Sequence, residues 1–107
     1  MASGIRLHNV KDGIVRNCYV SGLTKGLEVI NSDVLLSNNS FQRCKIAVEL
    51  VNSGAVIHNN YFMDNAIDIV VNRSKAKLID TLARRILAVL PNGGMQINPY
   101  VIRSMAI

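Results

Sequence analysis

The chain has 107 residues; half are hydrophobic, only 5% are aromatic, and tryptophan is absent. A chain of this length makes one domain, and a core of Ile, Val and Leu favours strands. The net charge of +5 would suit an acidic polysaccharide or a phosphate backbone, although many unrelated small domains are as basic. No stretch reaches the roughly 18 apolar residues of a membrane helix, and the first residues lack a signal-peptide pattern, so we expect no membrane partner.

Two short apolar phrases alternate along the chain and recur about every 21 residues. The first phrase reads GIRLHN at 4–9, GLEVIN at 26–31 and AVELVN at 47–52, with a worn copy, AIDIVVN, at 66–72. The second reads VRNCYV at 15–20, LSNNSF at 36–41 and IHNNYF at 57–62. Each phrase alternates apolar and polar residues between turn residues, which is typical of a short strand.

One such unit cannot bury its apolar face alone, whereas stacked units can, as in a solenoid. Strands about 4.8 Å apart place equivalent residues above one another. Stacked amides can satisfy backbone groups where the chain turns. We therefore predict two buried ladders of asparagines at the corners, one of Asn17, Asn38 and Asn59, the other of Asn9, Asn31 and Asn52.

The same alternation predicts which side chains face outward. If Leu27, Val29, Val48 and Leu50 point into the core, their neighbours point away from it. A sheet with apolar side chains on both faces is usually covered by other parts of a protein on both faces. We predict that two outward stripes form the interface of a homo-oligomer, a trimer or a dimer: Ile14, Leu35 and Val56, and Ile30, Val51 and Val70.

The end of the chain departs from the repeat. Thr81 is a candidate N-cap for a short amphipathic helix over 82–90, which Pro91 and the following glycines would end. Such a helix would close the end of the stack, and residues 95–107 are predicted to be an extended strand lying on a face. The single domain thus divides into repeats over 1–81 and a capping helix and tail over 82–107.

The phrases I-x-N-N-x-F and G-I-x-L-x-N resemble repeats of the pectate-lyase-like superfamily, especially its NosD-like and carbohydrate-binding or sugar-hydrolase members. The resemblance covers about residues 4–80. It implies an all-β fold, a right-handed parallel β-helix of about three and a half coils, which the short helix and terminal strand would close. The superfamily includes lyases, hydrolases, epimerases, binding modules and viral spikes, so its fold does not select an activity.

Candidate metal ligands are the acids Glu28, Glu49 and Asp68, which we place in one outward column with Arg6. Neighbouring carboxylates can supply oxygen ligands to calcium, and the alternative is a solvated charge stripe. His8 and His58 fall in different columns, so they do not form a metal site. Cys18 and Cys44 also fall in different columns, which argues against a disulfide. We expect no cofactor.

The resemblance also implies a glycan-binding alternative, because polysaccharide lyases of the superfamily use a basic residue beside calcium-binding acids. Residues that would contact an acidic polysaccharide are Arg43, Lys45, His58 and Tyr61. We predict no catalytic residue, since Arg43 lacks a matching acid pair and no long loop walls a groove. If the protein is an enzyme, it is a polysaccharide lyase or hydrolase.

Two hypotheses of function follow. The first is a non-catalytic β-helix module that acts through self-association or as part of a larger surface or spike-like protein. The alternative is a carbohydrate-binding or polysaccharide-processing module for acidic glycans. Nucleic acid is not an expected partner, because the basic residues are scattered among columns and aromatic residues do not interleave with them.

Overall fold

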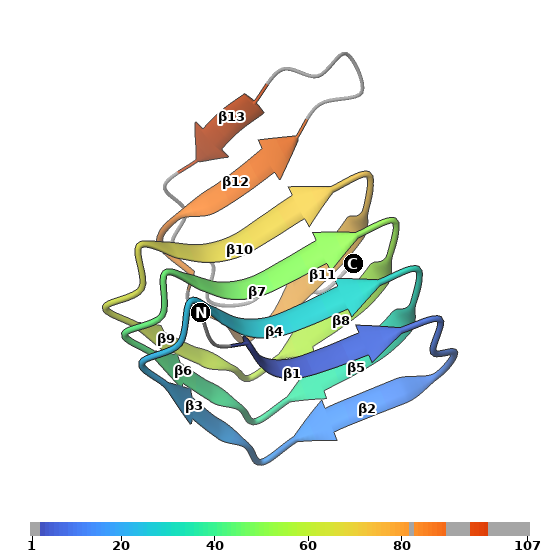
Figure 1. Cartoon of the computed structure of the whole chain (residues 1–107), viewed down its shortest axis with the longest axis horizontal. Helices are drawn as coiled ribbons and strands as arrows, with labels where there is room; N and C mark the ends of the chain where they lie inside the picture. The colour runs from blue at the N-terminus through green and yellow to red at the C-terminus, as the bar shows by residue number, and fades with distance from the viewer. Residues whose placement is uncertain (1–2, 82, 90–94, 99–107) are drawn as a thin grey trace.

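A computed structural model describes residues 3–81, 83–89 and 95–98. The chain winds in successive coils, and each full coil adds one strand to each of three sheets (Figure 1). The described residues contain no helix, so the predicted all-β fold is confirmed.

The three sheets are named A, B and C in the order in which the first coil visits them. Sheet A contains Ser3–His8 (β1), Lys25–Ile30 (β4), Ile46–Val51 (β7), Ile67–Asn72 (β10), Ile86–Val89 (β12) and Met95–Asn98 (β13). Sheet B contains Gly13–Arg16 (β2), Asp33–Ser37 (β5), Gly54–His58 (β8) and Lys75–Ile79 (β11). Sheet C contains Tyr19–Ser21 (β3), Ser40–Gln42 (β6) and Tyr61–Met63 (β9).

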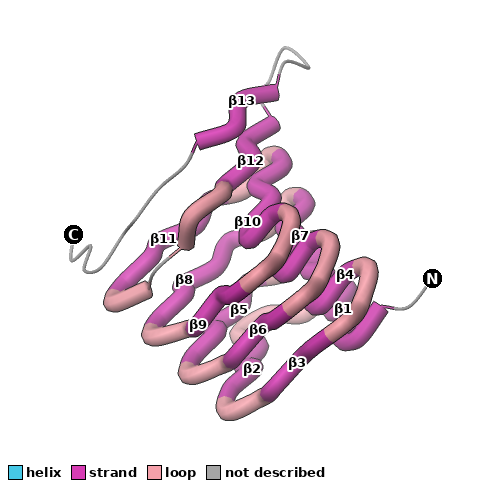
Figure 2. Tube along the Cα trace, turned by 90° about the vertical axis from the view of Figure 1, so that its left-hand side faces the viewer, coloured by secondary structure: helices cyan, strands magenta, loops and turns pink. Residues whose placement is uncertain are grey.

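Strands of equivalent coils pair in parallel, which gives a parallel β-helix (Figure 2). The step between paired residues is 21 in sheets B and C, as from Leu36 to Ile57. Equivalent side chains therefore stack inside the coils. The rings of Phe41 and Phe62 lie 5.4 Å apart and nearly parallel. The four residues predicted to point inward are fully buried, which confirms the predicted alternation: Leu27, Val29, Val48 and Leu50.

Each corner of the coil begins with a residue in the left-handed backbone region, with φ between 46° and 74°. Asparagine and glycine adopt this region at lower cost than other residues. All six asparagines of the two predicted ladders are such corner residues, and all six are exposed. They are Asn9, Asn31 and Asn52 between sheets A and B, and Asn17, Asn38 and Asn59 between sheets B and C.

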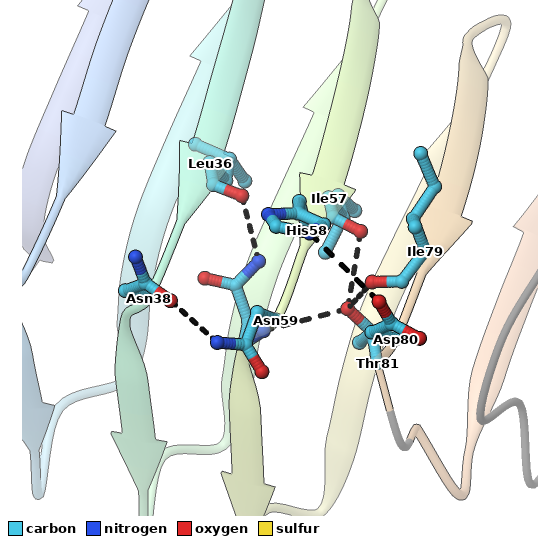
Figure 3. A network of polar contacts seen from close by, with 9 residues as sticks. Leu36, Asn38, Ile57, His58, Asn59, Ile79, Asp80 and Thr81 are labelled. Carbon is cyan, nitrogen blue, oxygen red and sulfur yellow. Dashed lines mark hydrogen bonds and ion pairs between the residues drawn. The ribbon is translucent and has the colours of Figure 1, made fainter.

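The prediction that these asparagines are buried is therefore wrong, although they do stack. The Nδ2 of Asn59 donates to the Oδ1 of Asn38 at 2.6 Å on the outside of the corner (Figure 3). Their sequence positions follow from the turn conformation and not from burial.

The buried ladders are made by the residue that follows each corner residue. The Oδ1 of Asn39 accepts the backbone N–H of Cys18 at 3.0 Å, and the Oδ1 of Asn60 accepts that of Asn39 at 2.9 Å. The Oγ1 of Thr81 continues this ladder by accepting the N–H of Asn60 at 3.4 Å. A serine ladder occupies the corner between sheets A and B, and it comprises Ser32, Ser53 and Ser74.

The two asparagines of each Asn-Asn pair thus have different structural roles at a corner. The first turns the chain in the left-handed region, and the second points inward and satisfies a backbone donor of the preceding coil. Thr81, predicted as a helix N-cap, instead belongs to this interior ladder and is fully buried.

The predicted helix over 82–90 is wrong for the part that the structure describes. Ile86–Val89 forms β12, which pairs in parallel with β10 and places Ile86 beside Ile69. This step is 17 residues, because residues 83–85 add no strand to sheet C. Pairing with the open edge of β10 satisfies backbone groups and buries Ile86, an advantage that a single short helix lacks.

The final described strand, β13, runs antiparallel to β12 along the edge of sheet A. The extended conformation predicted for the tail is confirmed for Met95–Asn98, but this strand pairs at the edge of sheet A and does not lie on a face; the rest of 95–107 lies outside the described residues. The two carboxylate oxygens of Asp68 stabilise the turn into β12. One accepts from the Nδ2 of Asn65 at 3.1 Å, and the other from the N–H of Arg84 at 2.8 Å.

Candidate functional site

The outer face of sheet B carries a continuous column of exposed apolar side chains. Ile14, Leu35 and Val56 pair in register on β2, β5 and β8, and Lys77 of β11 follows them. Their exposed fractions are 59%, 37% and 36%. They point outward because the residues that follow them fill the core: Val15, Leu36 and Ile57.

A second column on this face carries charge. Asp33, Gly54 and Lys75 pair in register, and Asp12 occupies the equivalent place before β2. Asp12, Asp33 and Lys75 are all exposed. The two columns together line a shallow depression of about 540 Å³, which we call the sheet B face. It carries acids at the first two coils, apolar side chains at the first three, and Lys75 and Lys77 at the fourth.

The other predicted stripe is not continuous. Ile30 and Val51 pair in register and are half-buried, but the next residue in their column is Asn72. Val70 pairs with Glu49 and is 5% exposed. The prediction misplaced the worn copy at 66–72 by two residues, because it aligned Ala66 with Ala47, whereas in the structure Ile67 pairs with Ile46.

The predicted acidic column is interrupted in the same way. Glu28 and Glu49 are neighbours, and the Nζ of Lys25 lies 3.7 Å and 2.9 Å from their carboxylates. The hydrogen bond to Glu49 raises the pKa of Lys25 above its ordinary value of 10.5; partial burial opposes this shift, and the charges of both glutamates add to it. The ammonium offsets the repulsion between the two acids. Asp68 lies in another column and is buried at the turn into β12.

No group of three or more His, Cys, Asp or Glu side chains that could hold a metal ion occurs among the described residues. Cys18 and Cys44 are free, and they lie at different corners. The backbone N–H of Cys18 donates into the asparagine ladder, and that of Cys44 donates to the Oδ1 of Asn65 at 2.8 Å.

The four residues proposed to contact a glycan are divided between one corner and two sheets. Tyr61 is exposed on β9, and the guanidinium of Arg43 at the adjoining corner donates to the hydroxyl of Ser21 at 2.9 Å. Lys45 lies two residues after Arg43 in that corner and is also exposed. His58 is on sheet B, where its Nε2 lies 3.9 Å from a carboxylate oxygen of Asp80 (Figure 3).

The outer face of sheet C also contains Tyr19, which the sequence analysis missed. Tyr19, Ser40 and Tyr61 pair in register on β3, β6 and β9, and the two tyrosines are 63% and 49% exposed. The hydroxyl of Tyr19 donates to the Oε1 of Gln42 at 3.3 Å. The sequence contained the information needed to find Tyr19, because two tyrosines separated by two periods of 21 residues must share a column.

In the part of the chain that the structure describes, no helix has the length and apolar character needed to cross a membrane. A search of curated proteins and a search of solved structures found no match to the chain. A family model described as a right-handed β-helix region matches residues 1–82. This match spans most of the sequence and agrees with the parallel coils, so the chain belongs to the right-handed β-helix family.

Proposed function

We propose that this β-helix is a non-catalytic association module, and that copies of it assemble through the sheet B face. It would do so as a domain by itself or as part of a larger surface or spike-like protein. The observation that carries the proposal is the exposed apolar column of Ile14, Leu35 and Val56. Contiguous apolar surface with a polar rim is the usual mark of a protein interaction site.

The physical advantage of this surface is its rigidity. Parallel neighbours hold the three side chains in register, so association orders little additional backbone. Complete burial of a Val, Leu or Ile side chain contributes about 1.5–3 kcal/mol, and these side chains already have part of that burial. The column therefore supplies a moderate driving force, and the rim charges would set the orientation.

The test is the molar mass in solution, measured by sedimentation equilibrium over a wide range of concentrations. We expect the wild type to associate and the double variant Leu35→Asp/Val56→Asp to be monomeric with unchanged strand content. Tyr19→Asp/Tyr61→Asp is the control, because it places two acids at exposed positions of sheet C, outside the sheet B face. The proposal would be overturned by a wild type that stays monomeric up to about 1 mM, because a dissociation constant of that size corresponds to a binding free energy of only about 4 kcal/mol. Equal dissociation of both variants would also overturn it.

The outer face of sheet C supports a second candidate, the binding of an acidic glycan. Tyr19 and Tyr61 stand two coils apart, which is roughly 9.6 Å, with Gln42 near Tyr19. Each ring offers an apolar body and a polar hydroxyl. Arg43 beside them can form charge-assisted hydrogen bonds with a uronate carboxylate.

Titration calorimetry with a panel of uronate oligosaccharides tests this candidate. We expect binding that weakens as salt rises and that is lost in Tyr19→Ala/Tyr61→Ala and reduced in Arg43→Ala. Leu35→Asp/Val56→Asp is the control and should bind normally. A panel that yields neither heat nor unsaturated products would reject both glycan binding and a lyase activity.

A further inference from the structure

The charges on the sheet B face are ordered along the solenoid axis. From the first coil to the fourth, the charged column reads Asp12, Asp33, Gly54 and Lys75. The column beside it reads Ile14, Leu35, Val56 and Lys77, so the middle of its four positions lies between Leu35 and Val56. The acidic end and the basic end of the face therefore lie on opposite sides of this apolar centre.

A twofold axis can place the sheet B face of a second copy against that of the first in two simple ways. If the two solenoids run in the same direction, the axis follows one column; with the axis on the apolar column, Lys77 meets Lys77, and Asp12 faces Arg16 of the next outward column. If they run in opposite directions, the order is reversed, and Asp12 meets Lys75 at both ends. Like charges placed together are destabilising, and opposite charges are attractive.

We propose that the partner of the sheet B face is a second copy of this chain in the antiparallel arrangement, with the twofold axis parallel to the strands. Leu35 of each copy then packs on Val56 of the other, next to the axis. Asp33 faces Gly54, where no side chain obstructs it. An interface that is self-complementary in this way closes at two copies. The inference rests on the proposed function, since it uses the same surface.

The size of the face predicts a weak dimer. Four strands about 4.8 Å apart and about five residues of roughly 3.3 Å each give a face of about 320 Å². A stable complex usually buries about 800 Å² on each partner. We therefore expect a dissociation constant in the micromolar range or above, and a dimer that forms only as concentration rises.

A charge-reversal cycle tests the orientation. In the antiparallel dimer, Lys75→Asp places two acids together at both ends, and Asp12→Lys places two lysines together. Each substitution acts twice, so we expect each to raise the dissociation constant about tenfold or more. The double variant Asp12→Lys/Lys75→Asp recreates both attractive pairs and should restore the wild-type value. Lysine at position 12 must adopt a positive φ, as Arg43 and Arg73 already do.

Sedimentation equilibrium on these variants separates the outcomes. Lys45→Asp is the matched control, because it makes the same charge change at an exposed site outside the sheet B face and should leave the constant unchanged. Weakening by both single variants with recovery in the double supports the antiparallel dimer. If the wild type dimerises and Leu35→Asp/Val56→Asp does not, but the charge variants behave like the wild type, the orientation is overturned while the proposed function stands. A monomeric wild type overturns both.

Discussion

The interior asparagine ladder can be tested by replacing Asn60 with leucine. Asn60 is 5% exposed, and its Oδ1 accepts from both the N–H and the Nδ2 of Asn39, at 2.9 Å and 3.0 Å. Its own Nδ2 donates to the carbonyl oxygen of Leu36 at 2.8 Å. Leucine of similar size can make none of these hydrogen bonds. The N–H of Asn39 and the carbonyl oxygen of Leu36 would then lose this partner at a buried corner, whereas the Nδ2 of Asn39 keeps its hydrogen bond to the carbonyl oxygen of Val15 at 2.9 Å.

The expected loss of stability is large for a domain of this size. An unsatisfied buried polar group costs about 1–3 kcal/mol, so two such groups cost about 4 kcal/mol. The added apolar surface returns about 1–2 kcal/mol, which leaves a net loss of about 2–3 kcal/mol. Since domains are usually stable by only about 5–15 kcal/mol, this one change would remove a large part of the total.

Asn59→Gly is the matched control at the neighbouring position. Asn59 is exposed and has a φ of 57°, which glycine adopts without strain. We expect this variant to lie within about 1 kcal/mol of the wild type, because it loses one exposed hydrogen bond and gains freedom only in the unfolded chain. Urea unfolding followed by circular dichroism measures both. The reasoning is refuted if Asn60→Leu costs less than about 1 kcal/mol, or if the two variants lose equal stability.

Three further substitutions test other parts of the fold. Gly26→Ala would place a methyl group 2.7 Å from the carbonyl oxygen of Ala47, so the adjacent coil must move, and we expect thermal unfolding to show a loss of about 2–3 kcal/mol. Asp68→Ala removes the acceptor for the turn into β12, and hydrogen exchange should show β12 opening before β7, whereas uniform protection would contradict this role. Lys25→Met should reduce stability at pH 8, because the folded pKa of Lys25 is raised. The stabilisation by Lys25 is complete below its ordinary pKa of 10.5 and is lost as the pH rises through its folded pKa. Urea unfolding should therefore show the free energies of unfolding of the wild type and the variant converging at that higher pH. A difference that grows with pH would contradict this assignment.

The corner asparagines show which features of a corner could be predicted from the sequence alone. An Asn-Asn pair contains one residue that turns the chain and one that points inward, and both roles suit asparagine. The pair Asn38-Asn39 therefore does not tell which residue is buried. The other corner carries the missing signal, because serine follows the corner asparagine in Asn31-Ser32 and Asn52-Ser53. A residue with no preference for positive φ marks the inward position.

The tail shows a different limit. The spacing of Ile86 and Leu87 with the flanking leucines is compatible with an amphipathic helix as well as with a buried strand. The unpaired edge of β10 decides between them, since it offers backbone partners in register with β12. The buried role of Asp68 could not be predicted from the sequence either. Its role depends on the N–H of Arg84, which approaches it only after the chain has turned.

The sequence by itself determined the period, the alternation of inward and outward side chains, and the exposed column on the sheet B face, because all of these are local patterns repeated every 21 residues. Only the tertiary structure decided which residues of a corner are buried, where the coils end, and that Asp68 lies outside the column of Glu28 and Glu49. The repeat itself places Asp12 and Lys75 in one column, because they are 63 positions, or three periods of 21, apart. They stand on one face because three successive parallel pairings carry the register from coil to coil, and that register results from the packing of the whole stack.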